Sequence, residues 1–285
     1  MIQILLIVIT LPLLFTLIET LIWFKILHQQ TNTKTPPKKN WQNAIAFLTG
    51  ISDYKATNLQ PEQINFIQNI SKHFPTDIAI AEPFPYEKIT APKYFPLDIW
   101  DKIGYESPPL LVISLHNFWQ TIFSAWFPKT HGKIVAKCLI NRLGIPETTH
   151  SNLIFICGSV GANIALTAAP ILTKNWQIRV SIISYGGVFG STSAFDSIDH
   201  FYHLVGKQDN WTKIGKILFP QRLLSRGGIA KARQENRYSI HYTGEHTHMG
   251  YLSEIQVNPT QLTYQDLTLK TVIQLPIWEK LSSQL

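Results

Sequence analysis

The fold is decided by the stretch Leu153-Ile-Phe-Ile-Cys-Gly-Ser-Val-Gly-Ala-Asn-Ile-Ala-Leu166. Four apolar residues, a cluster of small residues around Ser159 and a helix-like run predict a strand, a tight turn and a helix. A serine on such a turn cannot pack into the sheet, so its hydroxyl stands above the sheet edge, where a substrate and a base can reach it. Small residues at Cys157 and Gly161 keep the strand and helix backbones from colliding at the turn.

Strands and helices alternate through the rest of the body. Residues 110–127 form either a strand running into a helix or one helix, whose aromatic face is core or a lid over an apolar substrate. Residues 264–281 form a helix or a strand-to-helix passage interrupted at Pro276. The alternation predicts an α/β fold with a doubly wound, mainly parallel sheet flanked by helices. Strands are predicted at residues 43–48, 77–81, 177–184, 201–205 and 237–242, and helices at 61–70, 97–103 and 133–143.

Three reactive residue types follow late strands of this predicted sheet, in the order Ser159, Asp209, His248. The carboxyl ends of parallel strands border the binding crevice, so we expect the three side chains to converge there. An imidazole can take the serine proton, and a carboxylate on its other nitrogen fixes the tautomer and stabilises the cation. The set therefore predicts a catalytic triad.

Alternatives remain for two of these roles. Asp196 and Asp199 follow the preceding strand and compete with Asp209 for the role of the acid, and His246 competes with His248 for the role of the base. A His-x-His pair also suits a metal site, but no acidic or thiolate companion stands at ligand spacing, so no metal is expected.

The segment Cys157-Gly158-Ser159-Val160-Gly161 resembles the nucleophile elbow of the α/β-hydrolase superfamily, and the order serine, acid, histidine is similar to the order in that superfamily. It departs from the family's Gly-x-Ser-x-Gly at its first position, where Cys157 replaces glycine. The resemblance covers about residues 44–252 and implies a serine hydrolase that works through an acyl-enzyme.

A tetrahedral oxyanion would need backbone donors. The Val160 N–H, at the positive start of the elbow helix, is the first candidate. The second is expected after the strand at 43–48, where Gly50 lets the backbone approach closely, with Ile51 favoured over Ser52. The family's extended His-Gly motif is missing near Gly50, and some members of this fold have lost catalysis. The alternative function is therefore an inactive hydrolase-fold scaffold or binding protein at a membrane.

Residues 1–27 are the most apolar segment, interrupted by Pro12 and Glu19, and approach the roughly 20 residues that span a bilayer. No Lys or Arg precedes the apolar run and no Ala-x-Ala-like site follows, which disfavours a cleavable signal peptide. We expect a single-pass N-terminal anchor, although the helix could instead lie on the membrane or pack on the body. Residues 28–40 are a predicted linker and 41–285 one hydrolase-like domain. The lysines after the segment place the body in the cytoplasm by the positive-inside rule: Lys25, Lys34, Lys38 and Lys39.

Composition narrows the choice of partners. Only 15% of residues are charged and the net charge is +7, which suits an anionic lipid surface; no basic and aromatic recognition motif for nucleic acid is present. Two cysteines indicate neither a disulfide framework nor a thiolate metal site. Gly158-Ser-Val-Gly161 lacks the spacing and the lysine of a nucleotide-binding loop, and no cofactor is expected.

The substrate expected from these features is a small-molecule or lipid ester with an apolar acyl part, met at a membrane surface. Water or another acceptor could take the acyl group. The features are the apolar N-terminus, the aromatic segment at 118–127 and a basic run of Lys213, Lys216, Arg222, Arg226, Lys231, Arg233 and Arg237.

Overall fold

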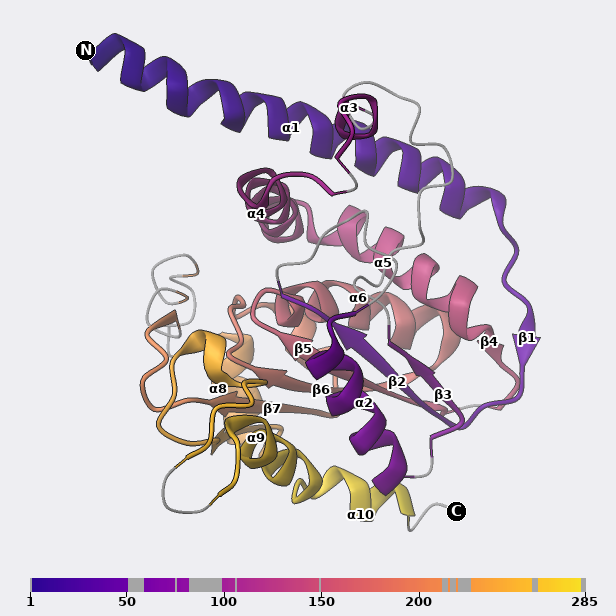
Figure 1. The fold of residues 1–285 in the computed structure, drawn as a ribbon. Coiled ribbons are helices and arrows are strands. Elements are labelled where there is room, and N and C mark those ends of the chain that lie inside the picture. Colours follow the sequence, from indigo (N-terminus) through magenta and orange to yellow (C-terminus); the bar gives the residue numbers. More distant parts are fainter. Residues whose placement is uncertain are drawn as a thin grey trace.

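A computed structural model describes residues 2–50, 59–74, 76–81, 99–105, 107–148, 150–211, 215, 219, 227–257 and 261–282. Within these residues one six-stranded sheet has the order β3-β2-β5-β6-β7-β8, and every neighbouring pair is parallel (Figure 1). A separate two-stranded pair joins β1 (Lys38–Lys39) to β4 (Ile145–Pro146). The strands of the main sheet are β2 (Asn43–Leu48), β3 (Ile78–Ile80), β5 (Asn152–Gly158), β6 (Arg179–Tyr185), β7 (His200–Val205) and β8 (Tyr238–Tyr242).

The strand order confirms the predicted doubly wound, α/β-hydrolase-like sheet. The chain steps from β2 to β3 in one direction, returns to β5 on the other side of β2, and continues outward through β6, β7 and β8. The strand order therefore reverses between β2 and β5. Ligands of open α/β sheets bind at such a switch point, outside the carboxyl ends of the strands. Gly50 follows β2 and Ser159 follows β5, so both lie at this point.

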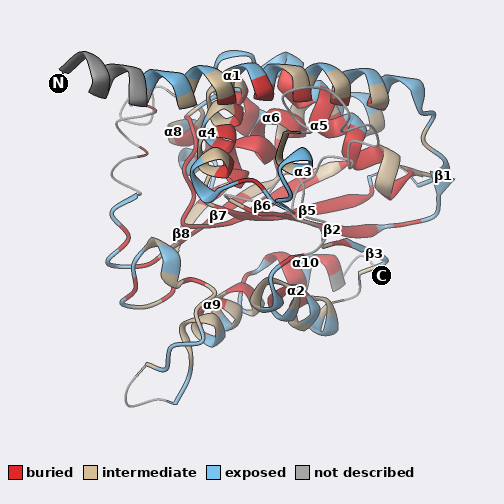
Figure 2. Ribbon diagram, turned by 45° about the horizontal axis from the view of Figure 1, so that its top comes forward, coloured by how far each residue is buried: buried red, intermediate tan, exposed pale blue. Residues whose placement is uncertain are grey.

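Helices cover both faces of the sheet (Figure 2). Alternate residues of β2 belong to two separate cores: Ala44, Ala46 and Leu48 pack on the side of α5 and α6, and Ile45 and Phe47 on the side of α2. This alternation follows from the two-residue period of a strand, and its apolar character on both faces is typical of a buried parallel strand. One face carries α1 (Ile2–Thr33), α4 (Leu110–Trp126), α5 (Pro128–Leu143), α6 (Gly161–Trp176) and α8 (Gly228–Gln234); the other carries α2 (Pro61–His73), α9 (Tyr264–Ile273) and α10 (Ile277–Ser282).

Helix α4 agrees with one of the two alternatives for this segment, the single helix. Residues 110–126 form one helix from its first residue, and the helix buries a polar stripe that includes His116, Asn117 and Gln120. Phe118 and Trp126 are exposed, so they do not form the apolar core that the aromatic spacing indicated. Aromatic periodicity located the helix, and the exposure of Phe118 and Trp126 contradicts the core alternative for these two residues. The short helix α3 (Ile99–Lys102) lies within the predicted range, whereas α8 was not predicted.

The N-terminal helix is longer than predicted and continues to Thr33. Its segment Thr10–Thr33 has a mean hydropathy of 1.7 and is long and apolar enough, by length and composition, to cross a membrane. The buried core helix of a soluble protein and a signal sequence have the same properties. After Thr33 the chain reaches β1, so part of the predicted linker pairs with β4.

A close crossing of α5 and α6 generates the first prediction. A Cβ atom at Gly132 would lie 2.0 Å from the carbonyl oxygen of Thr167. Gly132→Ala should therefore lower the free energy of unfolding by about 1–3 kcal/mol, because the added methyl group must push the helices apart. Urea unfolding followed by circular dichroism measures the change.

The control is Thr130→Ala, at an exposed position of the same helix, which should change stability by less than about 0.5 kcal/mol. Alanine in a helix is otherwise favoured over glycine by about 1 kcal/mol. Unchanged or higher stability of Gly132→Ala would therefore contradict the close crossing.

Candidate active site

Ser159 occupies the turn between β5 and α6 with a φ of +46°, a left-handed conformation that is uncommon for a residue other than glycine. Two backbone hydrogen bonds hold the turn: the Ser159 N–H donates to the Tyr185 carbonyl at 3.0 Å, and the Val188 N–H donates to the Ser159 carbonyl at 3.0 Å. Both bonds come from the end of β6 and the loop after it. The neighbouring strand therefore fixes the strained conformation of the serine.

Small residues allow this turn, at positions close to those the sequence indicated. A Cβ atom at Gly161 would lie 2.8 Å from the Leu48 carbonyl oxygen, and one at Gly50 would lie 2.9 Å from the Ser159 Cβ. The Cys157 side chain does not crowd the turn, because it is fully buried in the core on the side of α5 and α6. Burial also raises the pKa of its thiol, which keeps the thiol protonated and unreactive. A cysteine at the first position of the elbow is thus compatible with the turn.

His248 lies between Ser159 and Asp209. Its Nε2 is 3.0 Å from Ser159 Oγ, and its Nδ1 is 3.0 Å from Asp209 Oδ2 and 3.2 Å from Asp209 Oδ1. With the ring proton on Nδ1, the Ser159 hydroxyl donates to Nε2 and the ring donates to the carboxylate. The Asp209 side chain is fully buried, and 15% of the His248 side chain is exposed. The structure thus brings together the three residues predicted from the strand ends.

Asp209 accepts two further hydrogen bonds. The Trp211 N–H donates to Oδ1 at 2.9 Å, and the Tyr251 hydroxyl donates to Oδ2 at 2.8 Å. The same hydroxyl accepts the Gly206 N–H at 2.8 Å. Burial disfavours the charged carboxylate, but the hydrogen bonds from His248, Tyr251 and Trp211 outweigh it, so the pKa of Asp209 lies below its ordinary value of 3.8. Asp209 is therefore held as a carboxylate facing His248.

Sequence reasoning missed Tyr251. Tyr251 comes directly after the short 3-10 turn His248–Gly250, and the turn brings its hydroxyl to Asp209. Neither apolar periodicity nor a motif marks such a position. Its ring is buried, with 2% of the residue exposed, so sequence alone would identify it as a core aromatic residue.

His246, the alternative base, has both ring nitrogens engaged elsewhere. The Thr243 hydroxyl donates to Nε2 at 2.8 Å, and Nδ1 donates to the Thr247 carbonyl at 2.9 Å. The ring is buried and lies edge-on to Tyr251, with their centroids 4.5 Å apart. His246 thus packs beneath the loop that carries His248.

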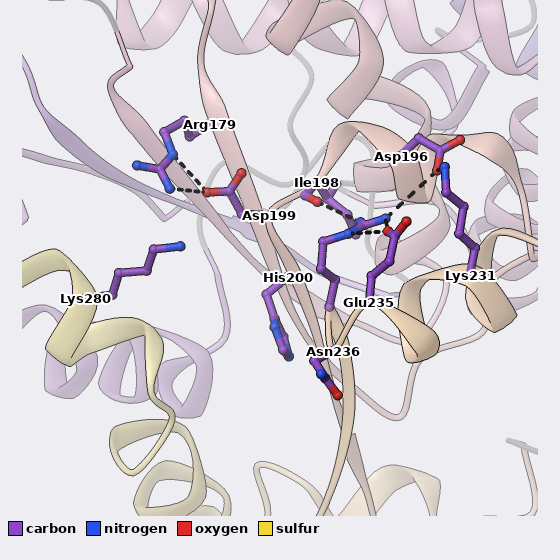
Figure 3. A pocket seen from close by; sticks show the side chains of 10 residues that line it. Arg179, Asp196, Ile198, Asp199, His200, Lys231, Glu235, Asn236 and Lys280 are labelled. Atoms are coloured by element: carbon purple, nitrogen blue, oxygen red, sulfur yellow. Dashed lines mark hydrogen bonds and ion pairs between the residues drawn. The ribbon is translucent and has the colours of Figure 1, made fainter.

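Asp196 and Asp199, the alternative acids, lie before β7 at the amino-terminal edge of the sheet. Asp196 accepts from Lys231 at 2.7 Å, and Asp199 pairs with Arg179 at 2.7 Å. Both carboxylates line a pocket of about 590 Å³, in which Asp199 pairs with Arg179, Asp196 with Lys231 and Glu235 with Arg237 (Figure 3). This pocket is at the opposite edge of the sheet from Ser159, so neither residue can orient His248.

Of the two predicted oxyanion donors, Val160 lies among the described residues and Ile51 does not. Val160 precedes the first residue of α6 with helical φ and ψ. The first N–H groups of a helix have no partner inside it, and they attract negative charge. Ile51 lies outside the described residues. Among the described residues no group of three or more His, Cys, Asp or Glu side chains could hold a metal ion.

Comparisons with known proteins do not show a family for this chain. No protein-family model matches the chain, and no curated protein matches its sequence. A solved structure similar to it is a dienelactone hydrolase-like promiscuous phosphotriesterase from metagenomic libraries, with a TM-score of 0.44, 13% sequence identity and coverage of 88% of each chain. The chain's own sheet order shows a doubly wound, parallel α/β fold with helices on both faces.

The second prediction concerns Tyr251. Tyr251→Phe removes a donor to Asp209 and leaves the buried Gly206 N–H without its acceptor, so it should lower the free energy of unfolding by about 1–3 kcal/mol at neutral pH. The pKa of Asp209 should rise toward its ordinary value of 3.8 because the carboxylate loses a donated hydrogen bond.

A group with a depressed pKa stabilises the fold above its unfolded pKa, and this stabilisation is lost as the pH falls through the folded pKa. Urea unfolding from pH 7 to pH 3 should therefore show the difference between wild type and Tyr251→Phe shrinking below about pH 4. A difference that is constant or grows toward acid pH would mean that the hydroxyl does not support the Asp209 carboxylate.

Proposed function

We propose that the protein is a serine hydrolase or acyltransferase that acts on an ester with an apolar acyl part. The observation that carries the proposal is the chain of short contacts from Ser159 Oγ through His248 to the buried Asp209 carboxylate. A serine hydroxyl becomes a nucleophile when a base takes its proton, and the base needs an orienting partner on its other nitrogen. The strained turn at Ser159 places the hydroxyl where a substrate carbonyl can approach.

The proposed reaction has two halves. Ser159 Oγ attacks the ester carbonyl carbon while its proton passes to His248 Nε2, and the Asp209 carboxylate stabilises the imidazolium. The tetrahedral oxyanion accepts a hydrogen bond from the Val160 N–H. The carbon–oxygen bond to the alcohol breaks as His248 returns the proton to the leaving oxygen. Water or another hydroxyl acceptor then attacks the acyl-enzyme by the same steps, which releases Ser159.

Apolar side chains beside His248 support an apolar acyl group. The Trp211 ring lies 5.5 Å from the His248 ring, measured between centroids, and Trp211 is 47% exposed. Met249 follows His248 and is 87% exposed. Large exposed apolar side chains at a reactive group favour contact with an apolar ligand.

The described part of the basic run lies away from the candidate site. Lys231 and Arg237 line the charged pocket at the amino-terminal edge of the sheet, where they pair with Asp196 and Glu235. Lys213, Lys216, Arg222 and Arg226 lie outside the described residues. The proposal for an apolar ester therefore depends on the surroundings of His248 and on the apolar N-terminal helix.

The third prediction concerns turnover of p-nitrophenyl esters of increasing acyl length. Ser159→Ala and His248→Ala should each lower kcat/KM about 10³-fold or more, and Asp209→Asn should lower it less, because the acid only orients and stabilises the base. Esters with longer acyl chains should be turned over faster than acetate, because exposed apolar side chains lie beside His248.

One variant provides the control. Asp196→Asn should keep wild-type turnover, because Asp196 lies at the far edge of the sheet. Wild-type turnover in His248→Ala would move the role of the base to His246. Equal turnover in wild type and Ser159→Ala would refute the mechanism and leave an inactive scaffold.

A further inference from the structure

The N-terminal helix turns its polar side inward. Thr16, Glu19 and Thr20 of α1 are fully buried. His116 of α4 reaches this side, with its Nδ1 3.1 Å from Thr20 Oγ1 and 3.3 Å from Glu19 Oε2. On its other nitrogen it accepts from Gln120 Nε2 at 2.7 Å. The polar groups of α1 are thus satisfied by α4.

The outward side of α1 is apolar. Its exposed leucine and isoleucine residues are spaced three and four positions apart, so they form one stripe along the helix. A surface helix of a soluble protein has apolar residues inward and polar residues outward. Helix α1 shows that arrangement only further along, where Trp23 and Leu27 are buried and Lys25 is exposed. The outer surface of α1 is drawn as exposed in Figure 2. The stripe consists of Leu11, Leu14, Ile18 and Leu21, between 45% and 60% exposed.

Helix α4, which packs against α1, also exposes apolar side chains. Trp119 joins the two helices, because its Nε1 donates to the Leu13 carbonyl and to Thr16 Oγ1, both at 3.2 Å. The exposed Phe118 ring packs edge-on against Trp119, with the centroids 5.3 Å apart. We call the combined surface the α1–α4 face. It contains the four residues of the α1 stripe together with Leu110, Leu111, Phe118 and Trp126 of α4.

The net positive charge of the chain falls in the sequence segments that contain this face. Residues 1–48 and 110–146 hold eight Lys or Arg residues and one acidic residue, the buried Glu19, whereas the rest of the chain holds seventeen of each sign. The whole net charge of +7 therefore belongs to α1, α4, α5 and their flanking segments. Lys137 of α5 donates to Asn32 of α1, which places this lysine beside α1. The exposed lysines are Lys25, Lys34, Lys38, Lys39, Lys129, Lys133 and Lys137.

We propose that the α1–α4 face binds an anionic lipid bilayer, with α1 lying along the membrane surface while it stays docked on α4. Exposed apolar side chains bordered by lysines match the acyl and headgroup layers of such a bilayer. A free-standing single-pass anchor would instead expose Glu19, Thr16 and Thr20 to hydrocarbon, which is costly for polar groups. In this proposal α1 and α4 therefore contact the bilayer together.

This attachment links the membrane to the candidate active site. Asn163 of α6, one turn after Ser159, donates to Ser124 of α4 at 2.7 Å and accepts from the Gly190 N–H at 3.2 Å. Helix α4 is thus tied to the helix that follows the nucleophile. The inference rests on the proposed function only for the nature of the substrate, because vesicle binding is measured without turnover.

The experiment places an environment-sensitive NBD probe at single engineered cysteines in the full-length chain. The two native cysteines, Cys138 and Cys157, are buried and should not react. Probes at Leu14→Cys of α1 and at Phe118→Cys of α4 test the face, and a probe at Gln68→Cys, exposed on α2 across the sheet, is the control. Vesicles contain phosphatidylcholine alone or equal parts of phosphatidylcholine and phosphatidylglycerol.

We expect the probes on α1 and α4 to shift to the blue on anionic vesicles and to be quenched by lipid-borne quenchers, while the α2 probe stays in water. A shift at α1 without a shift at α4 would overturn the proposal in favour of a free-standing anchor. No shift at either helix would also overturn it, and sedimentation of the free protein would then show whether a second copy covers the face.

Charge reversal provides the fourth prediction. Lys129→Glu with Lys133→Glu should lower the partition constant onto anionic vesicles about tenfold or more, because basic residues near an anionic surface add to the affinity. The matched control reverses two exposed lysines of the other layer, Lys72→Glu with Lys270→Glu, and should leave the partition constant within about twofold. Equal losses in the two double variants would show that net charge, and not the α1–α4 face, governs binding.

Discussion

The strained turn at Ser159 is the constraint on which the candidate site depends. Its positive φ lifts the hydroxyl above the sheet, and hydrogen bonds from the end of β6 and the loop after it hold that conformation. The turn is possible only where β2, β5 and α6 approach closely, at Gly50 and Gly161. The strand order reverses between β2 and β5 at the same place, and ligands of open α/β sheets bind at such a reversal. The close approach of β2, β5 and α6 thus determines both the local fold and the position of the candidate nucleophile.

The outer strands of the sheet supply the rest of the site. Asp209 follows β7 and His248 follows β8, and the parallel register brings the two loops to one edge. Tyr251 ties these loops together, because its hydroxyl joins the Gly206 N–H after β7 to the Asp209 carboxylate. His246 packs under the same loop. A buried carboxylate with several donors is rigid, and such rigidity is what orients an imidazole.

The sequence predicted the strands and the strand-end residues well, because buried parallel strands are continuous apolar runs and their carboxyl ends converge. It could not show Tyr251, whose hydroxyl meets Asp209 only through a turn. It also misjudged α4, because the buried stripe around His116 is polar and is satisfied by Glu19 and Thr20 of a helix distant in sequence. Ile51, the second expected oxyanion donor, stays a prediction.

The most direct test of the account is labelling of the full-length protein with a fluorophosphonate, followed by mass spectrometry of the modified peptide. The probe reacts only with a serine that a base has activated. The account predicts one adduct, on Ser159, with labelling abolished in Ser159→Ala and strongly reduced in His248→Ala. Absence of an adduct on folded wild type, or an adduct on another serine, would contradict the claim that Ser159, His248 and Asp209 act as a unit.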